Sequence, residues 1–125
     1  ISMDVDAILV QFEEISRAVS SCDVLIVEAL ATGPTEVLCS SGSHAVAALG
    51  YVMQKPVWLV AACGTRLPTP LWSAMTIGEA LNEGDFMSLS LLSRVISKDG
   101  ISDDMSQPLV AECPPTTELL RHSAI

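Results

Sequence analysis

The sequence predicts an α/β fold, because stretches with helical spacing of apolar residues alternate with short, continuous apolar runs. Two of these runs, residues 24–27 and 57–63, are rich in Val, Leu and Ile and have the composition of strands buried on both faces of a sheet. The order helix, strand, helix, strand, helix implies parallel strands joined by right-handed crossovers. We therefore expect a Rossmann-like, three-layer α/β fold with a mainly parallel sheet.

The first half of the chain supplies a helix, a buried strand and a second helix. An amphipathic helix is expected over residues 4–21, with Asp4 or Asp6 as its N-cap, because apolar residues recur there at helical spacing. The elements that follow it are expected at residues 24–27 (strand), 32–35 (Thr-Gly-Pro-Thr turn), 36–38 (short extended segment) and 43–54 (helix rich in small residues, ended by Lys55-Pro56).

The second half begins with the clearest strand, residues 57–63. Thr69 and Pro70 are typical of the first positions of a helix, which is expected to run to about Glu83 and to end at Gly84. The weaker expectations are a strand at 86–89, a short helical turn at 91–97, a turn at 98–100 and a last helical turn at 117–122.

Composition favours one domain over residues 1–125 and excludes several classes of partner. The chain has 125 residues, half of them hydrophobic, which suits a single core. Fifteen acidic residues against six basic ones give a net charge of −9, without a Lys/Arg cluster. Nucleic acids and anionic membrane surfaces need positive charge on the protein, so we expect neither as a partner.

The four cysteines, Cys22, Cys39, Cys63 and Cys113, form no C-x-x-C pair, and neither histidine lies at metal-ligand spacing from them. We therefore expect reduced thiols, no metal or other cofactor, and a cytoplasmic location. No apolar run approaches the ~20 residues of a membrane span. Because the sequence starts without Met, we expect that it could be a fragment of a longer chain.

In such a sheet, ligands collect at the carboxyl ends of the strands. Residues 28–34, 39–44 and 63–66 are expected at that edge. The run Ser40-Ser41-Gly42-Ser43 precedes a predicted helix, and free N–H groups at a helix start bind phosphate. The same residues are equally typical of an ordinary helix cap, so both interpretations stay open.

Residues 22–63, "CDVLIVEALATGPTEVLCSSGSHAVAALGYVMQKPVWLVAAC", resemble the C-terminal domain of the translation initiation factor 2B alpha/beta/delta family. That family includes the methylthioribose-1-phosphate and ribose-1,5-bisphosphate isomerases. The shared pattern is a strand beginning Asp-Val, a Gly-containing loop, Val-Leu, a Gly-Ser helix start, and then Pro-Val with an apolar strand. The later stretches "MSLSLLSRVISKDGIS" and "AECPPTTELLR" resemble the tail of some prokaryotic members.

The departures from the isomerases bear on activity. Their first strand ends in Gly-Ala-Asp, and the position of that acid is Leu30 here, which cannot exchange protons. Their Asn-Lys pair, which holds the phosphorylated sugar, is Cys39-Ser40 here, and the cysteine that partners their acid lies further upstream. The resemblance therefore implies a non-catalytic domain that assembles subunits and senses a phosphorylated sugar or nucleotide. The alternative is an isomerase of which only the C-terminal half is present.

No catalytic residue is assigned, and each candidate has a simpler interpretation. Glu28 could replace the lost acid or be a polar residue at the edge of the sheet, and Cys39 and Cys63 are typical small buried residues. A serine nucleophile at Ser41 lacks the flanking glycines of a nucleophile elbow. The candidate ligand-binding residues, for a phosphate or nucleotide, are Glu28, Ser40, Ser41, Gly42, Ser43 and His44.

Half-hydrophobic composition in so short a chain also predicts self-association, most simply as a two-fold homodimer or with related family subunits. The expected contact segments are residues 67–75, with Trp72 as the anchor, and residues 89–96.

Overall fold

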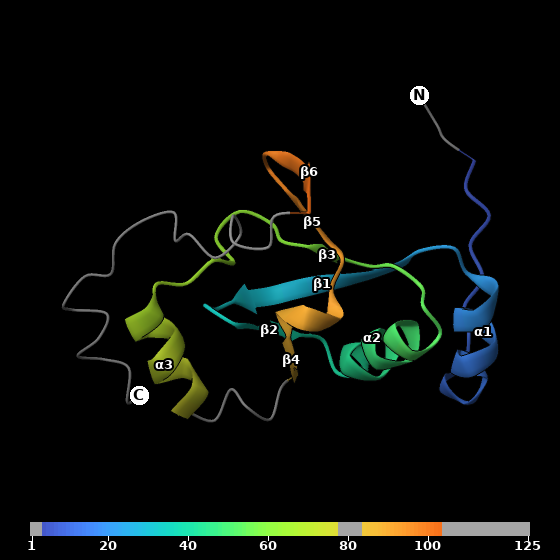
Figure 1. Cartoon of the computed structure of the whole chain (residues 1–125), viewed down its shortest axis with the longest axis horizontal. Helices are drawn as coiled ribbons and strands as arrows, with labels where there is room; N and C mark the ends of the chain where they lie inside the picture. The colour runs from blue at the N-terminus through green and yellow to red at the C-terminus, as the bar shows by residue number, and fades with distance from the viewer. Residues whose placement is uncertain (1–3, 78–83, 104–125) are drawn as a thin grey trace.

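The computed structural model describes residues 4–77 and 84–103 and contains a six-stranded sheet at its centre (Figure 1). The strand order is β4-β2-β1-β3-β5-β6. The strands are β1 (Leu25–Thr32), β2 (Glu36–Cys39), β3 (Val57–Val60), β4 (Asp85–Ser88), β5 (Arg94–Ser97) and β6 (Gly100–Ser102). The helices are η1 (Phe12–Glu14), α1 (Ile15–Ser21), α2 (Ser43–Val52), α3 (Thr69–Ile77) and η3 (Leu89–Leu91). The predicted Rossmann-like α/β fold is confirmed.

The centre of the sheet is parallel and its flanks are antiparallel. β1 pairs in parallel with β3, from Leu25 opposite Val57 onward, and β3 pairs in parallel with β5. The parallel pairing expected of the two clearest apolar runs is therefore confirmed. β2, β4 and β6 join antiparallel. For β2 the reason is the turn at 33–35, which is too short for a crossover and returns the chain beside β1. The sheet is thus only partly parallel.

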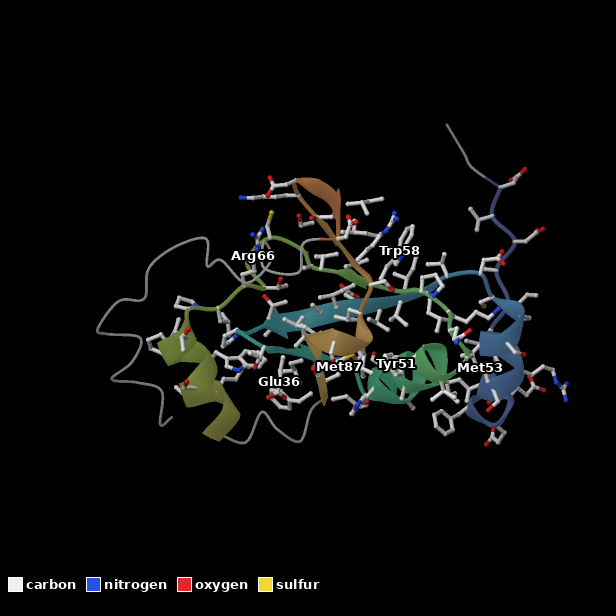
Figure 2. The ribbon with its side chains drawn as sticks, in the orientation of Figure 1. Glu36, Tyr51, Met53, Trp58, Arg66 and Met87 are labelled. Carbon is white, nitrogen blue, oxygen red and sulfur yellow. The ribbon has the colours of Figure 1, made fainter. Side chains whose placement is uncertain are left out.

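The main core lies on one face of the sheet, under α1 and α2. Alternate residues of β1 point to this face, and Leu59 of β3 and Val37 of β2 are completely buried there. Figure 2 shows Met87 on this side of the sheet, toward α2. The buried members are Val19, Leu25, Val27, Ala29, Val37, Cys39, Ala47, Val57, Leu59, Ala61, Met87, Leu92 and Val95.

A smaller core lies under α3, on the opposite face of β2. It buries Ala31, Leu38 and Trp72, with Phe86 packed against them. The register of β1 against β2 shifts between Ala29 and Ala31, as in a β-bulge, so Ala31 faces the α3 side although Ala29 faces α2. Helices therefore pack against both faces of the sheet, with α3 confined to the end formed by β1, β2 and β4.

Over the rest of the second face, residues 4–77 and 84–103 place no helix. We define the open face by the residues that the register places together on it: Ile26, Glu28, Leu30, Trp58, Val60, Arg94, Ile96 and Ile101. Three of its apolar side chains are well exposed, at 62% for Ile26, 49% for Leu30 and 58% for Ile101. Trp58 lies on the side of the sheet away from α2 (Figure 2). Parallel strands are normally covered on both faces, so this surface is unusual.

Two helical predictions differ from the structure. The helix predicted at 4–21 is wrong for its first half: only η1 and α1 are helical, and Ile8 and Leu9 are 86% and 92% exposed. Tertiary packing supplies most of helical stability, and these exposed side chains contribute little of it. The helical turn predicted at 91–97 is also wrong, because most of it is β5, whose Val95 is buried beside β3.

The other elements fall close to their predicted places. α2 and β3 begin at the predicted residues and end two and three residues early, respectively, and α3 begins at Thr69. The expected end of that helix near Glu83, and the last turn at 117–122, lie outside the described residues. Within the described residues, no helix has both the length and the apolar character that crossing a bilayer requires.

Candidate functional site

A pocket of about 330 Å³ lies beside β1, between η1, α1 and the start of α2. It brings together four of the six predicted ligand-binding residues, namely Glu28, Ser41, Gly42 and Ser43. Apolar side chains form the rest of its wall: Phe12, Ile15, Ile26, Val27 and Val46. A small cavity with apolar walls and a few polar groups has the general character of a small-molecule site.

The local structure places Glu28 differently from the prediction. β1 was expected to end at residue 27, but the strand continues to Thr32, so Glu28 lies in mid-strand and not at a strand end. The alternation of β1 exposes its side chain on the open face. Glu28 belongs to the pocket lining as a residue of β1, and residues 41–43 line the pocket from the loop that follows β2.

The remaining two predicted residues do not line the pocket. Ser40 is exposed, and its carbonyl oxygen accepts a hydrogen bond from the N–H of Ser43 at 3.0 Å, which closes the turn before α2. The side chain of His44 is also exposed. Its backbone N–H, in the first turn of α2, donates a hydrogen bond to a carboxylate.

That carboxylate belongs to Asp85, the first residue of β4. Its Oδ2 atom accepts hydrogen bonds from the N–H of Gly42 at 2.8 Å and from the N–H of His44 at 3.2 Å. Gly42 is the N-cap residue of α2 and has φ of 96°, a left-handed conformation that favours glycine. The helix is therefore capped, but by a carboxylate from a distant strand and not by a serine hydroxyl. An anion does bind this turn, and the protein itself supplies it.

Asp85 also acts on the thiol of Cys39. The two residues are paired across β2 and β4, and Cys39 is completely buried. Burial, and secondarily the negative charge of Asp85, raise the pKa of the Cys39 thiol to about 11. Cys39 is therefore a protonated thiol near neutral pH, unsuited to nucleophilic attack. Cys63 is exposed and also free.

The charge around the pocket is negative. Glu28 lines it, Asp85 lies against the N–H groups of its loop, and no residue of its lining is basic. Leu30, at the place of the isomerase acid, is an exposed side chain on the open face. The residues that line the pocket thus include no lysine to hold a phosphorylated sugar.

Sequence reasoning missed Asp85 and the apolar wall of the pocket. Asp85 lies 43 residues beyond Gly42 along the chain, and only the antiparallel pairing of β4 with β2 brings it to the helix. The sequence carries a Gly-Asp pair at the start of this strand, and the pair gives no indication of a distant partner. Ile15 and Val46 were expected to belong to helices, and their helical spacing does indicate that they face the core.

Comparison with solved structures identifies a protein with a similar fold. Residues of this chain superpose on eIF2B beta from Chaetomium thermophilum with a TM-score of 0.63 and 18% sequence identity, over 74% of this chain and 28% of that one. The fold is that of eIF2B. No family model and no curated protein matches the sequence. The eIF2B-like chain therefore shares the fold with a much longer protein, of which it spans little more than a quarter.

Proposed function

We propose that this chain is a non-catalytic, initiation factor 2B-like domain that acts in subunit assembly and forms a homodimer. The observation that carries the proposal is the open face, an apolar surface over the parallel centre of the sheet on which none of the described helices packs. The eIF2B-like fold supports the choice of function, because the similar structure is a subunit of a translation factor. The isomerase remains the alternative.

The open face suits a second copy of the same chain. It carries one acid, Glu28, and one base, Arg94, so it has no net charge and does not complement a strongly charged partner. A surface that contains both signs can be its own complement across a two-fold axis. Trp58 lies at its centre on β3, and tryptophan is enriched among the side chains that anchor interfaces.

Trp72, the expected anchor of the contact, packs within the chain. It is 7% exposed, and its ring meets Phe86 edge to face at 5.6 Å between centroids. A charge at Trp72 would unfold the small core and could not report on assembly. Trp72 is therefore not the anchor of the contact, and we propose Trp58 in its place.

Light scattering on the full chain at micromolar concentration tests the proposal. We expect the mass of a dimer for the wild type and of a folded monomer for Trp58→Glu, with folding checked by circular dichroism. Tyr51→Glu is the matched control, because Tyr51 is 64% exposed on α2, away from the open face. A monomer mass for the wild type would refute the homodimer.

We further propose that a phosphorylated sugar or nucleotide binds at Glu28 and residues 40–44. The pocket and the N–H groups of Gly42 and His44 support this site. Because the Asp85 carboxylate already accepts from both N–H groups, a phosphate has to displace it. The ligand therefore competes with the Asp85 carboxylate for these N–H groups. Because Asp85 belongs to β4, its displacement would move the start of β4, and this movement would signal that a ligand is bound.

Titration with inorganic phosphate, followed by amide chemical shifts, tests the ligand site. We expect shifts at residues 41–44, with tighter binding to Asp85→Asn because the competing negative charge is gone. Asp99→Asn is the control, since Asp99 is an exposed acid in the turn between β5 and β6. If neither protein shows shifts at millimolar phosphate, capping by Asp85 is the whole role of this turn.

A further inference from the structure

We propose that two copies of the chain pack through their open faces so that Glu28 of each copy pairs with Arg94 of the other. This inference rests on the proposed homodimer and specifies its surface, its symmetry and the residues that fix its register. It is carried by the positions of the two charges within an otherwise apolar sheet face.

The two charges lie on opposite sides of the central strand. Arg94 on β5 is level with Trp58 on β3, and its guanidinium lies over the indole, with Cζ 5.6 Å from the ring centroid. Glu28 on β1 is level with Val60, the next residue of β3 on the same face. β1 and β5 are the two neighbours of β3 in the sheet. Acid and base are thus about 10 Å apart across the sheet and one residue pair, about 7 Å, apart along it.

A two-fold axis along β3 brings them together. Rotation about such an axis, in the plane between two stacked sheets, places β1 of one copy over β5 of the other. Glu28 then faces the partner's β5 about one residue pair from the partner's Arg94, which two long side chains can bridge. The centre of the contact is apolar, because Trp58 and Val60 of the two copies meet on the axis. Stacked sheets cross at about 30°, and this angle changes the distance along the strands between Glu28 and the Arg94 of the other copy.

The pairing explains why a charged residue is acceptable on each side of an apolar surface. Covering Glu28 or Arg94 without a partner would leave a buried, uncompensated charge, which is strongly unfavourable. The reciprocal pair satisfies both charges and rejects other registers of the two sheets.

Charge exchange tests the pairing on the full chain, with the dimer dissociation constant measured by sedimentation. We expect Glu28→Arg and Arg94→Glu each to weaken the dimer at least tenfold, and the double variant to recover most of the loss, because it restores the pair with its signs exchanged. Lys98→Glu is the control, since Lys98 is exposed in the turn beyond β5 and should leave the constant unchanged.

The outcomes separate this inference from the homodimer itself. If the wild type is a dimer and Trp58→Glu dissociates it, but the double variant is no tighter than the single ones, the pairing is refuted and the homodimer stands. If the wild type is a monomer, both are refuted. Should Arg94→Glu fail to fold because it loses Trp58, a cycle with Glu28→Gln and Arg94→Gln measures the same coupling, and no coupling between them overturns the pairing.

Discussion

Asp85 acts on two sites that lie far from it in the sequence, the first turn of α2 and the Cys39 thiol. One carboxylate oxygen holds the first turn of α2, while the same charge disfavours the thiolate of the neighbouring Cys39. Both effects follow from the place of one residue at the start of β4. The turn of residues 40–43 was predicted correctly as a helix start, but the residue that satisfies it could not be found from local pattern.

The Cys39 thiol gives a prediction for alkaline pH. Its pKa is about 11 in the folded protein and 9.0 for an ordinary cysteine, so the folded state holds the proton more tightly between these values. The free energy of unfolding should therefore fall as pH rises from about 9 to 11. Denaturant unfolding at several pH values in this range measures how the free energy of unfolding changes with pH. In Cys39→Ala the part of this change that comes from the thiol should disappear. Faster alkylation of Cys39 than of exposed Cys63 at neutral pH would contradict the shift.

Residue identity also predicts the absence of isomerase activity. Leu30 cannot move a proton, and the loop offers Cys39 and Ser40 where the resembling isomerases have Asn-Lys. We expect no turnover of methylthioribose 1-phosphate or ribose 1,5-bisphosphate in a coupled assay. Turnover that disappears in Glu28→Gln would overturn this prediction and would make Glu28 the catalytic acid.

At the scale of elements, the sequence predicts what local chemistry decides. β3 is a continuous apolar run, and α2 begins after a glycine and ends before Lys55-Pro56, so both were found. β5 was missed because residues 94–97 carry a short, ambiguous pattern, and their strand conformation depends on pairing with β3. Residues 4–11 were assigned to a helix from periodicity and from Asp4 or Asp6 as a possible N-cap, and neither reveals whether a second surface covers the apolar side.

The contact between the turn after β1 and α3 predicts a sharp steric effect. A Cβ atom added at Gly33 would overlap the carbon atoms of the Trp72 indole. Gly33→Ala should therefore lower the free energy of unfolding by about 1–3 kcal/mol, the usual cost of overpacking. Thermal melting measures the loss, and Trp72→Phe should reduce the additional cost of Gly33→Ala because the smaller ring leaves space. Equal costs in both backgrounds would show that the overlap is relieved elsewhere.

For the whole molecule, the fold class was within reach of the sequence and the arrangement of the site was not. The apolar runs predict the parallel centre of the sheet, and the serine turn predicts where α2 starts. The pocket depends on how η1, α1 and β1 come together, and its charge depends on Asp85, so neither has a local signature. The open face follows only from the complete strand order and register, because its residues come from β1, β3, β5 and β6.

The bulge in β1 limits how this chain can change in length. Between Ala29 and Ala31 the strand changes the face to which its residues point, so residues before it belong to the core under α2 and residues after it to the core under α3. Replacing either alanine by another small residue preserves that division. The bulge holds one extra residue of β1, Leu30, so its deletion would leave Ala29 and Ala31 opposite the same residues of β2 and would keep Ala31 toward Trp72. Inserting a further residue would instead turn Ala31 to the other face. Homologues of this domain should therefore tolerate the loss of a residue at 29–31 better than the gain of one.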